Sequence, residues 1–142
     1  MKYRVFLDTN VFIYALEIGD SNSAIIIKLL NEGKIECVVS ERVLKEVYHY
    51  IKTRIRNEKL ANDVRNFIYS SCLVVTNEFV MDYMQNFRGK IKEKDLEQLA
   101  AVKKLNLKFL ISYDKDFDEF EEYITPKGFV MLMGLKHRKT EY

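Results

Sequence analysis

Two short apolar runs, each leading to an aspartate, constrain the fold of this chain more than any other feature. Tyr3–Leu7 is followed by Asp8, and Phe109–Tyr113 is followed by Asp114. Runs of this length and composition are typical of strands covered on both faces, as in a parallel α/β sheet. The carboxyl ends of parallel strands meet at one edge of the sheet, where functional groups gather. The sequence therefore predicts that Asp8 and Asp114 lie close together.

The rest of the chain alternates between strand and helix patterns. The predicted strands are Tyr3–Leu7, Ile35–Val39, Cys72–Val75, Phe109–Tyr113 and Phe129–Leu132. The predicted helices are Val11–Leu16, Ser23–Asn31, Glu41 to about Arg56, Lys59–Ser70, Glu78–Phe87 and Leu96–Leu105. Ser40 is a predicted N-cap, and Pro126 with Gly128 is expected to break the chain before the last strand. Helices between short apolar strands favour a mostly parallel, five-stranded sheet covered on both faces. A chain of 142 residues is expected to form a single domain, residues 1–142.

Asp95 is a third candidate site residue, because of the helix face on which it lies. In a helix beginning near residue 95, Asp95 is in line with Leu99 and Val102, both apolar. A first-turn acid that only complements the helix dipole explains the position but not the choice of face. Burying a carboxylate is costly unless it is paired or bound to a metal. We therefore predict a functional role for Asp95.

Oxygen-rich clusters of this kind point to Mg²⁺ or Mn²⁺ as the cofactor. Two carboxylates about 5 Å apart repel each other by roughly 3 kcal/mol at an effective dielectric constant near 20, so a shared cation would stabilise them. Asp116 follows Asp114 at a spacing that lets both approach one ion, directly or through water. An Asp-rich turn that caps a short helix is the alternative for this pair. Glu46 lies toward the polar side of its predicted helix, where a solvated glutamate is the simpler interpretation.

Composition and missing motifs exclude several classes of protein. The formal net charge of +2 provides no strong general attraction to nucleic acid or membranes, and no stretch is apolar enough to span a bilayer. Because the N-terminus lacks a signal-peptide pattern, we expect a cytoplasmic protein. Neither His49 nor His137 is placed at a strand end, and no nucleophile elbow is present. Asn10, rather than an aspartate, stands two residues after Asp8, which argues against an aspartyl-phosphatase.

Four motifs in order resemble those of the PIN domain family and cover almost the whole chain. Val5–Ile13 resembles the opening motif, and Ser40–Val47 resembles the second, whose acid falls on Glu46. Asp95–Val102 and Leu110–Phe117 resemble the third and fourth, with acids on Asp95 and Asp114. Each motif alone is weak, but four in the family's order form a strong signal.

The resemblance implies a three-layer α/β/α fold and a Mg²⁺- or Mn²⁺-dependent ribonuclease acting on single-stranded RNA. The catalytic acids would be Asp8, Glu46, Asp95 and Asp114, with Asp8, Asp95, Asp114 and Asp116 as metal ligands. Asn10 and Ser112 would be supporting polar groups. Tyr113 is a departure, since many members have a small or polar residue there.

The resemblance also implies partners, and other functions stay open at this stage. Many small members are VapC-type toxins that are inhibited by a small antitoxin protein, and many form homodimers; apolar residues near Phe79–Phe87 are candidates for such a contact. The alternatives are an RNA-processing PIN nuclease without an antitoxin, a non-catalytic PIN-like RNA-binding module, and a structure-specific DNA nuclease. The intact set of acids argues against the binding module, and the short chain argues against the DNA nuclease.

Overall fold

Five parallel strands form the centre of the structure, a computed structural model that describes residues 2–142. Their order across the sheet is β3-β2-β1-β4-β5. The strands are β1 (Arg4–Leu7), β2 (Glu36–Ser40), β3 (Cys72–Val75), β4 (Phe109–Ile111) and β5 (Tyr123–Ile124). Because every pairing among the described strands is parallel, all their carboxyl ends point to the same edge of the sheet.

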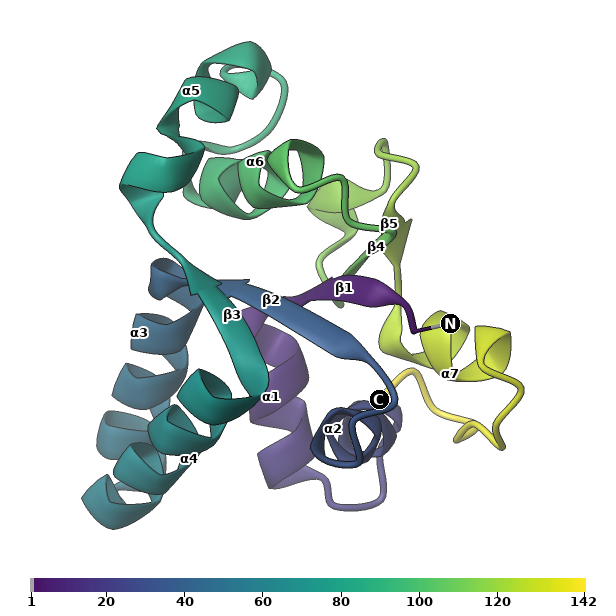
Figure 1. Ribbon diagram of the computed structural model, residues 1–142. Helices are drawn as coiled ribbons and strands as arrows, with labels where there is room; N and C mark the ends of the chain where they lie inside the picture. Colours follow the sequence, from purple (N-terminus) through teal and green to yellow (C-terminus); the bar gives the residue numbers. More distant parts are fainter. Residues whose placement is uncertain (1) are drawn as a thin grey trace.

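Helices cover both faces of this sheet (Figure 1). They are α1 (Thr9–Glu17), α2 (Asn22–Asn31), α3 (Glu41–Tyr50), α4 (Glu58–Ser71), α5 (Asn77–Phe87), α6 (Leu96–Lys104) and α7 (Pro126–Leu132). Figure 1 shows α5 and α6 above the sheet and α1 to α4 below it. The predicted three-layer α/β/α fold is therefore confirmed. No helix within residues 2–142 has both the length and the apolar character of a membrane span.

Capping side chains fix where several helices begin. Ser40 accepts a hydrogen bond from the backbone N–H of Val43, which confirms its predicted role as N-cap of α3. The long helix predicted from Glu41 to about Arg56 continues after α3 as a π-helical segment, Ile51–Ile55. Arg56 then adopts a left-handed backbone conformation (φ 59°), and Asn57 caps α4. The polypeptide consequently turns back where the first of these two predicted helices, Glu41 to about Arg56, gives way to the second, Lys59–Ser70.

The predicted strand Phe129–Leu132 is wrong, because these residues lie in α7. Thr125 accepts a hydrogen bond from the backbone N–H of Gly128, and Pro126 occupies the first helical turn, where its missing N–H costs nothing. The Thr125–Pro126 pair is thus a helix start here, whereas the pattern of Pro126 and Gly128 predicts a break in the chain before a strand. The fifth strand is the two-residue β5, which comes just before this cap.

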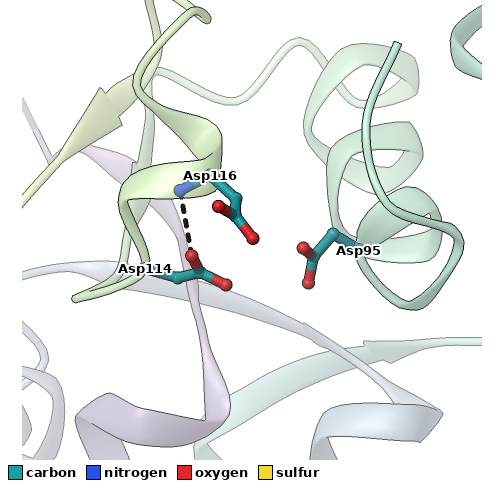
Figure 2. Close-up of side chains that lie close together, drawn as sticks. All are labelled: Asp95, Asp114 and Asp116. Carbon is teal, nitrogen blue, oxygen red and sulfur yellow. Dashed lines mark hydrogen bonds between the residues drawn. The ribbon is translucent and has the colours of Figure 1, made fainter. Parts of the chain in front are cut away.

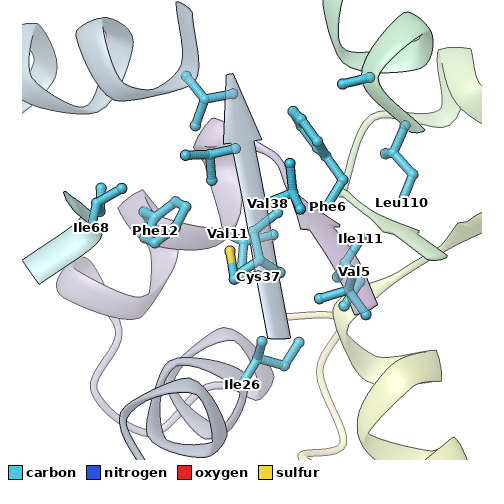
Figure 3. Packing of buried hydrophobic residues seen from close by; sticks show 14 of the residues in the cluster. Val5, Phe6, Val11, Phe12, Ile26, Cys37, Val38, Ile68, Leu110 and Ile111 are labelled. Atoms are coloured by element: carbon cyan, nitrogen blue, oxygen red, sulfur yellow. The ribbon is translucent and has the colours of Figure 1, made fainter. Parts of the chain in front are cut away.

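Strand β1 lies at the centre of the hydrophobic core and fixes the position of the site. Val5, Phe6 and Leu7 have no exposed surface, and residues of β2, β4, α1 and α2 surround them (Figure 3). In the register of the sheet, Leu7 is paired with Ile111 of β4. The residues that follow these two, Asp8 and Ser112, therefore emerge side by side at the carboxyl edge.

Candidate active site

Asp8 is buried at the end of β1 and is held by two hydrogen bonds. Its side chain is 6% exposed. One carboxylate oxygen accepts from the Ser112 hydroxyl at 2.7 Å, and the other accepts from the backbone N–H of Thr9 at 2.8 Å. The strand register explains the first contact, and the start of α1 explains the second. Asp8 therefore both caps α1 and presents an anionic group at the sheet edge.

Asp95 is buried on the opposite side of this edge. It closes the short 3₁₀ turn Glu93–Asp95 before α6, is 4% exposed, and makes no capping hydrogen bond. Leu99 and Val102 are also fully buried, as predicted for this helix face. One oxygen of Asp95, Oδ2, is buried without a hydrogen-bond partner in the described residues. A buried carboxylate oxygen without a donor is costly, and a cation beside it would satisfy it.

Asp114 and Asp116 approach Asp95 from the loop after β4. Each of these three carboxylates offers one oxygen, and the three oxygens lie within 4.8 Å of one another (Figure 2). The backbone N–H of Asp116 donates to Asp114 Oδ1 at 2.9 Å, which sets the direction of the Asp114 carboxylate. The carboxylate of Asp116 also forms an ion pair with Lys92 at 2.9 Å. Such a group of hard oxygen donors could hold a divalent ion.

Glu46 reaches the site from α3 even though the residue as a whole is exposed. Its Oε1 accepts a hydrogen bond from the Thr9 hydroxyl at 3.0 Å, next to Asp8. The sequence places Glu46 on the polar side of the helix, and that is where it lies. The polar side of α3 faces the site near this residue. Glu46 is therefore exposed to solvent and lines the pocket at the same time.

Asp8, Glu46, Asp95 and Asp114 line a single pocket of about 360 Å³. These carboxylates come from four separate parts of the sequence, and the fold brings them to one edge of the sheet. Asp116 does not line this pocket but joins the cluster through its contacts with Asp95 and Asp114. Neither histidine lines the pocket.

A family model matches most of this chain. The model for the PIN domain matches residues 5–123, which include every candidate acid. The chain belongs to the PIN domain family. No match was found among curated proteins.

Solved structures of low sequence identity share the fold of this PIN domain. A toxin–antitoxin complex from Klebsiella pneumoniae matches with a TM-score of 0.68 and 20% identity, covering 86% of this chain and 97% of that chain. VapBC2 from Rickettsia felis, bound to a DNA fragment from its promoter, matches with a TM-score of 0.61 and 15% identity over 86% and 96% of the two chains. VapC20 from Mycobacterium tuberculosis, a toxin that cleaves the sarcin–ricin loop, matches with a TM-score of 0.59 and 16% identity over 83% and 95%.

Burial and mutual repulsion shift the pKa values of the acids in the pocket of this PIN domain. Burial raises the pKa of Asp95 from 3.8 to about 6, and the negative charge of Asp114 adds to this rise. Burial also raises the pKa of Asp8, although the hydrogen bonds from Ser112 and Thr9 oppose the change. Partial burial also raises the pKa of Glu46.

The pKa of Asp116 shifts the other way, because the hydrogen bond from Lys92 lowers it. Nearby positive charge therefore does not offset the burial of Asp8 and Asp95, whereas Asp116 has a cationic partner in Lys92.

Asn10 and Ser112 connect the ends of β1 and β4, where the sequence predicts supporting groups. The Ser112 hydroxyl donates to Asp8 and accepts from the backbone N–H of Asp114 at 2.9 Å and from the Asn10 amide at 3.3 Å. The Asn10 side-chain oxygen accepts from the backbone N–H of Tyr113 at 3.3 Å. A hydroxyl has one proton and two lone pairs, so Ser112 uses its full capacity here.

We expect Ser112→Ala to destabilise the protein by about 1–3 kcal/mol, because it leaves buried groups around Asp8 without their partner. Ser112 has no exposed surface, so water cannot easily replace the hydroxyl. The same change removes the hydrogen bond that the Ser112 hydroxyl donates to Asp8, so the pKa of Asp8 should rise further. Denaturant unfolding at pH 7.5 measures the first effect. Ser70→Ala, at an exposed position on α4, is the control and should be close to neutral.

Sequence reasoning missed some of the polar residues that line the pocket, most clearly Gln98. Gln98 is 4% exposed, its amide lowers the pKa of Asp8, and its Oε1 is buried without a partner in the described residues. Its position could have been inferred, because Gln98 is three residues after Asp95 and so shares its helix face. Lys94 precedes Asp95, and Glu17 enters from the end of α1. Nothing in the local pattern around Glu17 distinguishes it from a solvated helix acid.

Proposed function

We propose that this PIN domain is a metal-dependent endoribonuclease that hydrolyses phosphodiester bonds of single-stranded RNA, and that it acts as the toxin of a toxin–antitoxin pair. One observation carries the catalytic part of the proposal: Asp8, Glu46, Asp95 and Asp114 line the same pocket. Carboxylates gathered in this way, two of them more than nine-tenths buried, are unfavourable unless a cation joins them.

The donor set fits Mg²⁺ or Mn²⁺. All the donors are hard carboxylate oxygens, and Asp95 Oδ2 has no other partner among the described residues. We assign direct contact with the ion to Asp8, Asp95 and Asp114. Asp116, which Lys92 already neutralises, is assigned an outer position. Divalent ions in such sites polarise the phosphate, lower the pKa of a bound water and stabilise the leaving oxygen.

The neighbouring residues of the chain would orient and bind rather than react. Ser112 and Asn10 hold the Asp8 and Asp114 segments at fixed spacing through the hydrogen bonds described above. Lys94 lines the pocket and offers a positive charge to an RNA phosphate. Glu46, at the solvent side and hydrogen-bonded to Thr9, would accept a proton from an attacking water.

The structural neighbours support the toxin part of the proposal. Two of them are toxin–antitoxin assemblies and the third is a toxin that cleaves the sarcin–ricin loop. This chain covers 97%, 96% and 95% of those three chains. We infer that this chain, like the toxins of those two assemblies, has a small antitoxin as its partner.

Cleavage of mixed RNAs by the purified protein tests the enzymatic proposal. We expect cleavage with Mn²⁺, none with EDTA, and at least a 1,000-fold slower reaction for Asp8→Asn, since it removes a charge that the ion requires. Asp63→Asn, at an exposed position on α4, should cleave at the wild-type rate. Wild-type cleavage by Asp8→Asn, or cleavage that persists in EDTA, would refute the assignment.

A further inference from the structure

The lining of the pocket includes residues whose presence the acids do not explain. Besides the carboxylates, it contains Ile13 and Tyr14 of α1 and Tyr50 of α3. Tyr14 is the centre of an aromatic group: its ring centroid lies 4.8 Å from that of Tyr113 and 4.5 Å from that of Tyr142. Tyr113 and Tyr142 are themselves 5.4 Å apart. Three tyrosines from distant parts of the chain therefore meet at the edge of the pocket.

The segment 138–142 is brought to this place by one buried side chain. Asn22, at the start of α2, has no exposed surface. Its amide nitrogen donates to the Thr140 carbonyl at 3.2 Å, and its side-chain oxygen accepts from the backbone N–H of Arg138 at 2.8 Å. Its backbone N–H donates to the carbonyl of Tyr142. Both the backbone and the side chain of Asn22 are thus used to hold this segment.

Further contacts fix both ends of the segment. The Arg138 guanidinium forms an ion pair with Asp20 at 2.5 Å, just before α2. At the other end, the Tyr113 hydroxyl lies 2.6 Å from the Ser23 hydroxyl and 3.5 Å from the Tyr142 carbonyl. Ordering each residue of a segment costs conformational entropy, so this many matched contacts indicate a defined position rather than a loose end. The segment also lies outside residues 5–123, the part that the PIN domain model matches.

Tyr14 is half-buried and packs against both of its aromatic neighbours. The ring of Tyr142 is tilted by 33° against that of Tyr14, and Tyr113 meets Tyr14 edge-on at 68°. These neighbours restrict the rotamer of Tyr14, while Tyr14 still lines the pocket that contains the acids. An aromatic side chain held beside a phosphate-binding site is the usual means of holding an unpaired base, because every base has a π-face.

We propose that Tyr14 is a nucleobase-stacking subsite next to the reacting phosphate, and that segment 138–142 is the positioning element that holds it in place through Tyr142. The inference rests on the proposed function in taking RNA as the substrate. Tyr113, which departs from the family's usual small or polar residue, belongs to the same subsite as the edge that supports Tyr14. The ligand class is a nucleotide with its phosphate at the acids and its base on the ring.

Two probes that cannot be cleaved test this subsite. They are 2-aminopurine riboside 5′-monophosphate, whose fluorescence is quenched by stacking, and ribose 5-phosphate, which lacks a base. In Mg²⁺ we expect the nucleotide to bind about 10-fold more tightly than the sugar phosphate, with quenched fluorescence. Equal affinity of the wild-type protein for the two probes, without quenching, would overturn the proposal.

Substitutions distinguish the role of the Tyr14 ring from that of Tyr142, which supports it. Tyr14→Leu should abolish both the quenching and the preference for the nucleotide, whereas Tyr14→Phe should keep them. Tyr142→Ala should reduce the preference about threefold while the affinity for ribose 5-phosphate stays unchanged, a combination that a general loss of folding would not produce. Tyr69→Ala, at a 59% exposed tyrosine outside the pocket, is the matched control and should change neither. A wild-type preference in Tyr14→Leu would also refute the subsite.

The outcome can be separated from that of the proposed nuclease activity. If the protein cleaves no RNA but binds the nucleotide in preference to the sugar phosphate, the subsite stands and the nuclease proposal fails. If it cleaves RNA but shows no preference for either probe, the nuclease proposal stands and the subsite is wrong.

Discussion

Asp95→Asn is expected to stabilise the metal-free protein by on the order of 2–3 kcal/mol at pH 7.5 and to abolish RNA cleavage. A carboxyl group whose pKa rises from 3.8 to about 6 on folding is held in its charged form at a cost of about 3 kcal/mol above that pH. Asn has nearly the same shape and no charge, and Asp95 makes no capping hydrogen bond that the change would remove. Loss of function together with a gain of stability is typical of a site strained for its activity.

The stability of the metal-free protein should also depend on pH, because the pKa of Asp95 differs between the folded and unfolded states. Because the folded pKa of Asp95 lies above the unfolded one, the folded state binds its proton more tightly between about pH 4 and 6. The stability of the wild-type protein should therefore fall as the pH rises through this range, and the burial of Asp8 contributes in the same direction. Asp95→Asn should flatten this part of the curve. Urea unfolding from pH 4 to pH 8 measures it.

Asp116→Asn is the matched control for Asp95→Asn. Asp116 belongs to the same carboxylate cluster, but Lys92 lowers its pKa, so its charge favours the folded state. Its removal should bring no gain in stability at pH 7.5. If both substitutions stabilised the protein equally, a general release of negative charge would explain the result, and the specific strain at Asp95 would be refuted.

Mn²⁺ is expected to raise the melting temperature by on the order of 10 °C at pH 7.5. An ion present at 100 times its dissociation constant stabilises the folded state by about 2.7 kcal/mol, and a domain of this size gains several degrees for each kcal/mol. The gain should be much smaller at pH 5, because protons compete for Asp95, whose pKa is about 6 without metal. Thermal melts with Mn²⁺ and with EDTA at the two pH values measure both effects.

The acid variants show whether the ion binds at the pocket. Asp95→Asn should lose the Mn²⁺-dependent rise in melting temperature, and Asp63→Asn should retain it. A rise of equal size in Asp95→Asn would place the ion elsewhere. An absence of any rise in the wild-type protein would contradict the metal site itself.

The sequence was sufficient to predict four of the five strands of the central sheet and the meeting of Asp8 with Asp114. Buried parallel strands leave a strong local signal in runs of apolar residues, and each acid directly follows such a run or, like Asp95, lies in line with an apolar helix face. The carboxyl edge of a parallel sheet then brings them together whatever their separation in sequence. Glu46 was different, because an exposed position on a helix looks the same whether or not a site lies beside it.

Other features could not be predicted because their causes are not local. The Thr125–Pro126 pair is compatible with a chain break or a helix start, and only the packing of Phe129 and Val130 in the core decides for the helix. Likewise, nothing near Asn22 in the sequence indicates that it binds a segment more than 110 residues away. Polar contacts between distant residues form only in the complete fold. The spacing of apolar residues along the sequence predicts local helices and strands but not such contacts.

Anomalous scattering from Mn²⁺ in crystals of the protein tests the central claim most directly. We predict one strong peak in the pocket, within coordination distance of oxygens of Asp8, Asp95 and Asp114, and no such peak in crystals of Asp95→Asn. If the wild-type pocket contained no peak under these conditions, or if Mn²⁺ bound only at other surface acids, the carboxylates would not share a cation and the proposed chemistry would be contradicted.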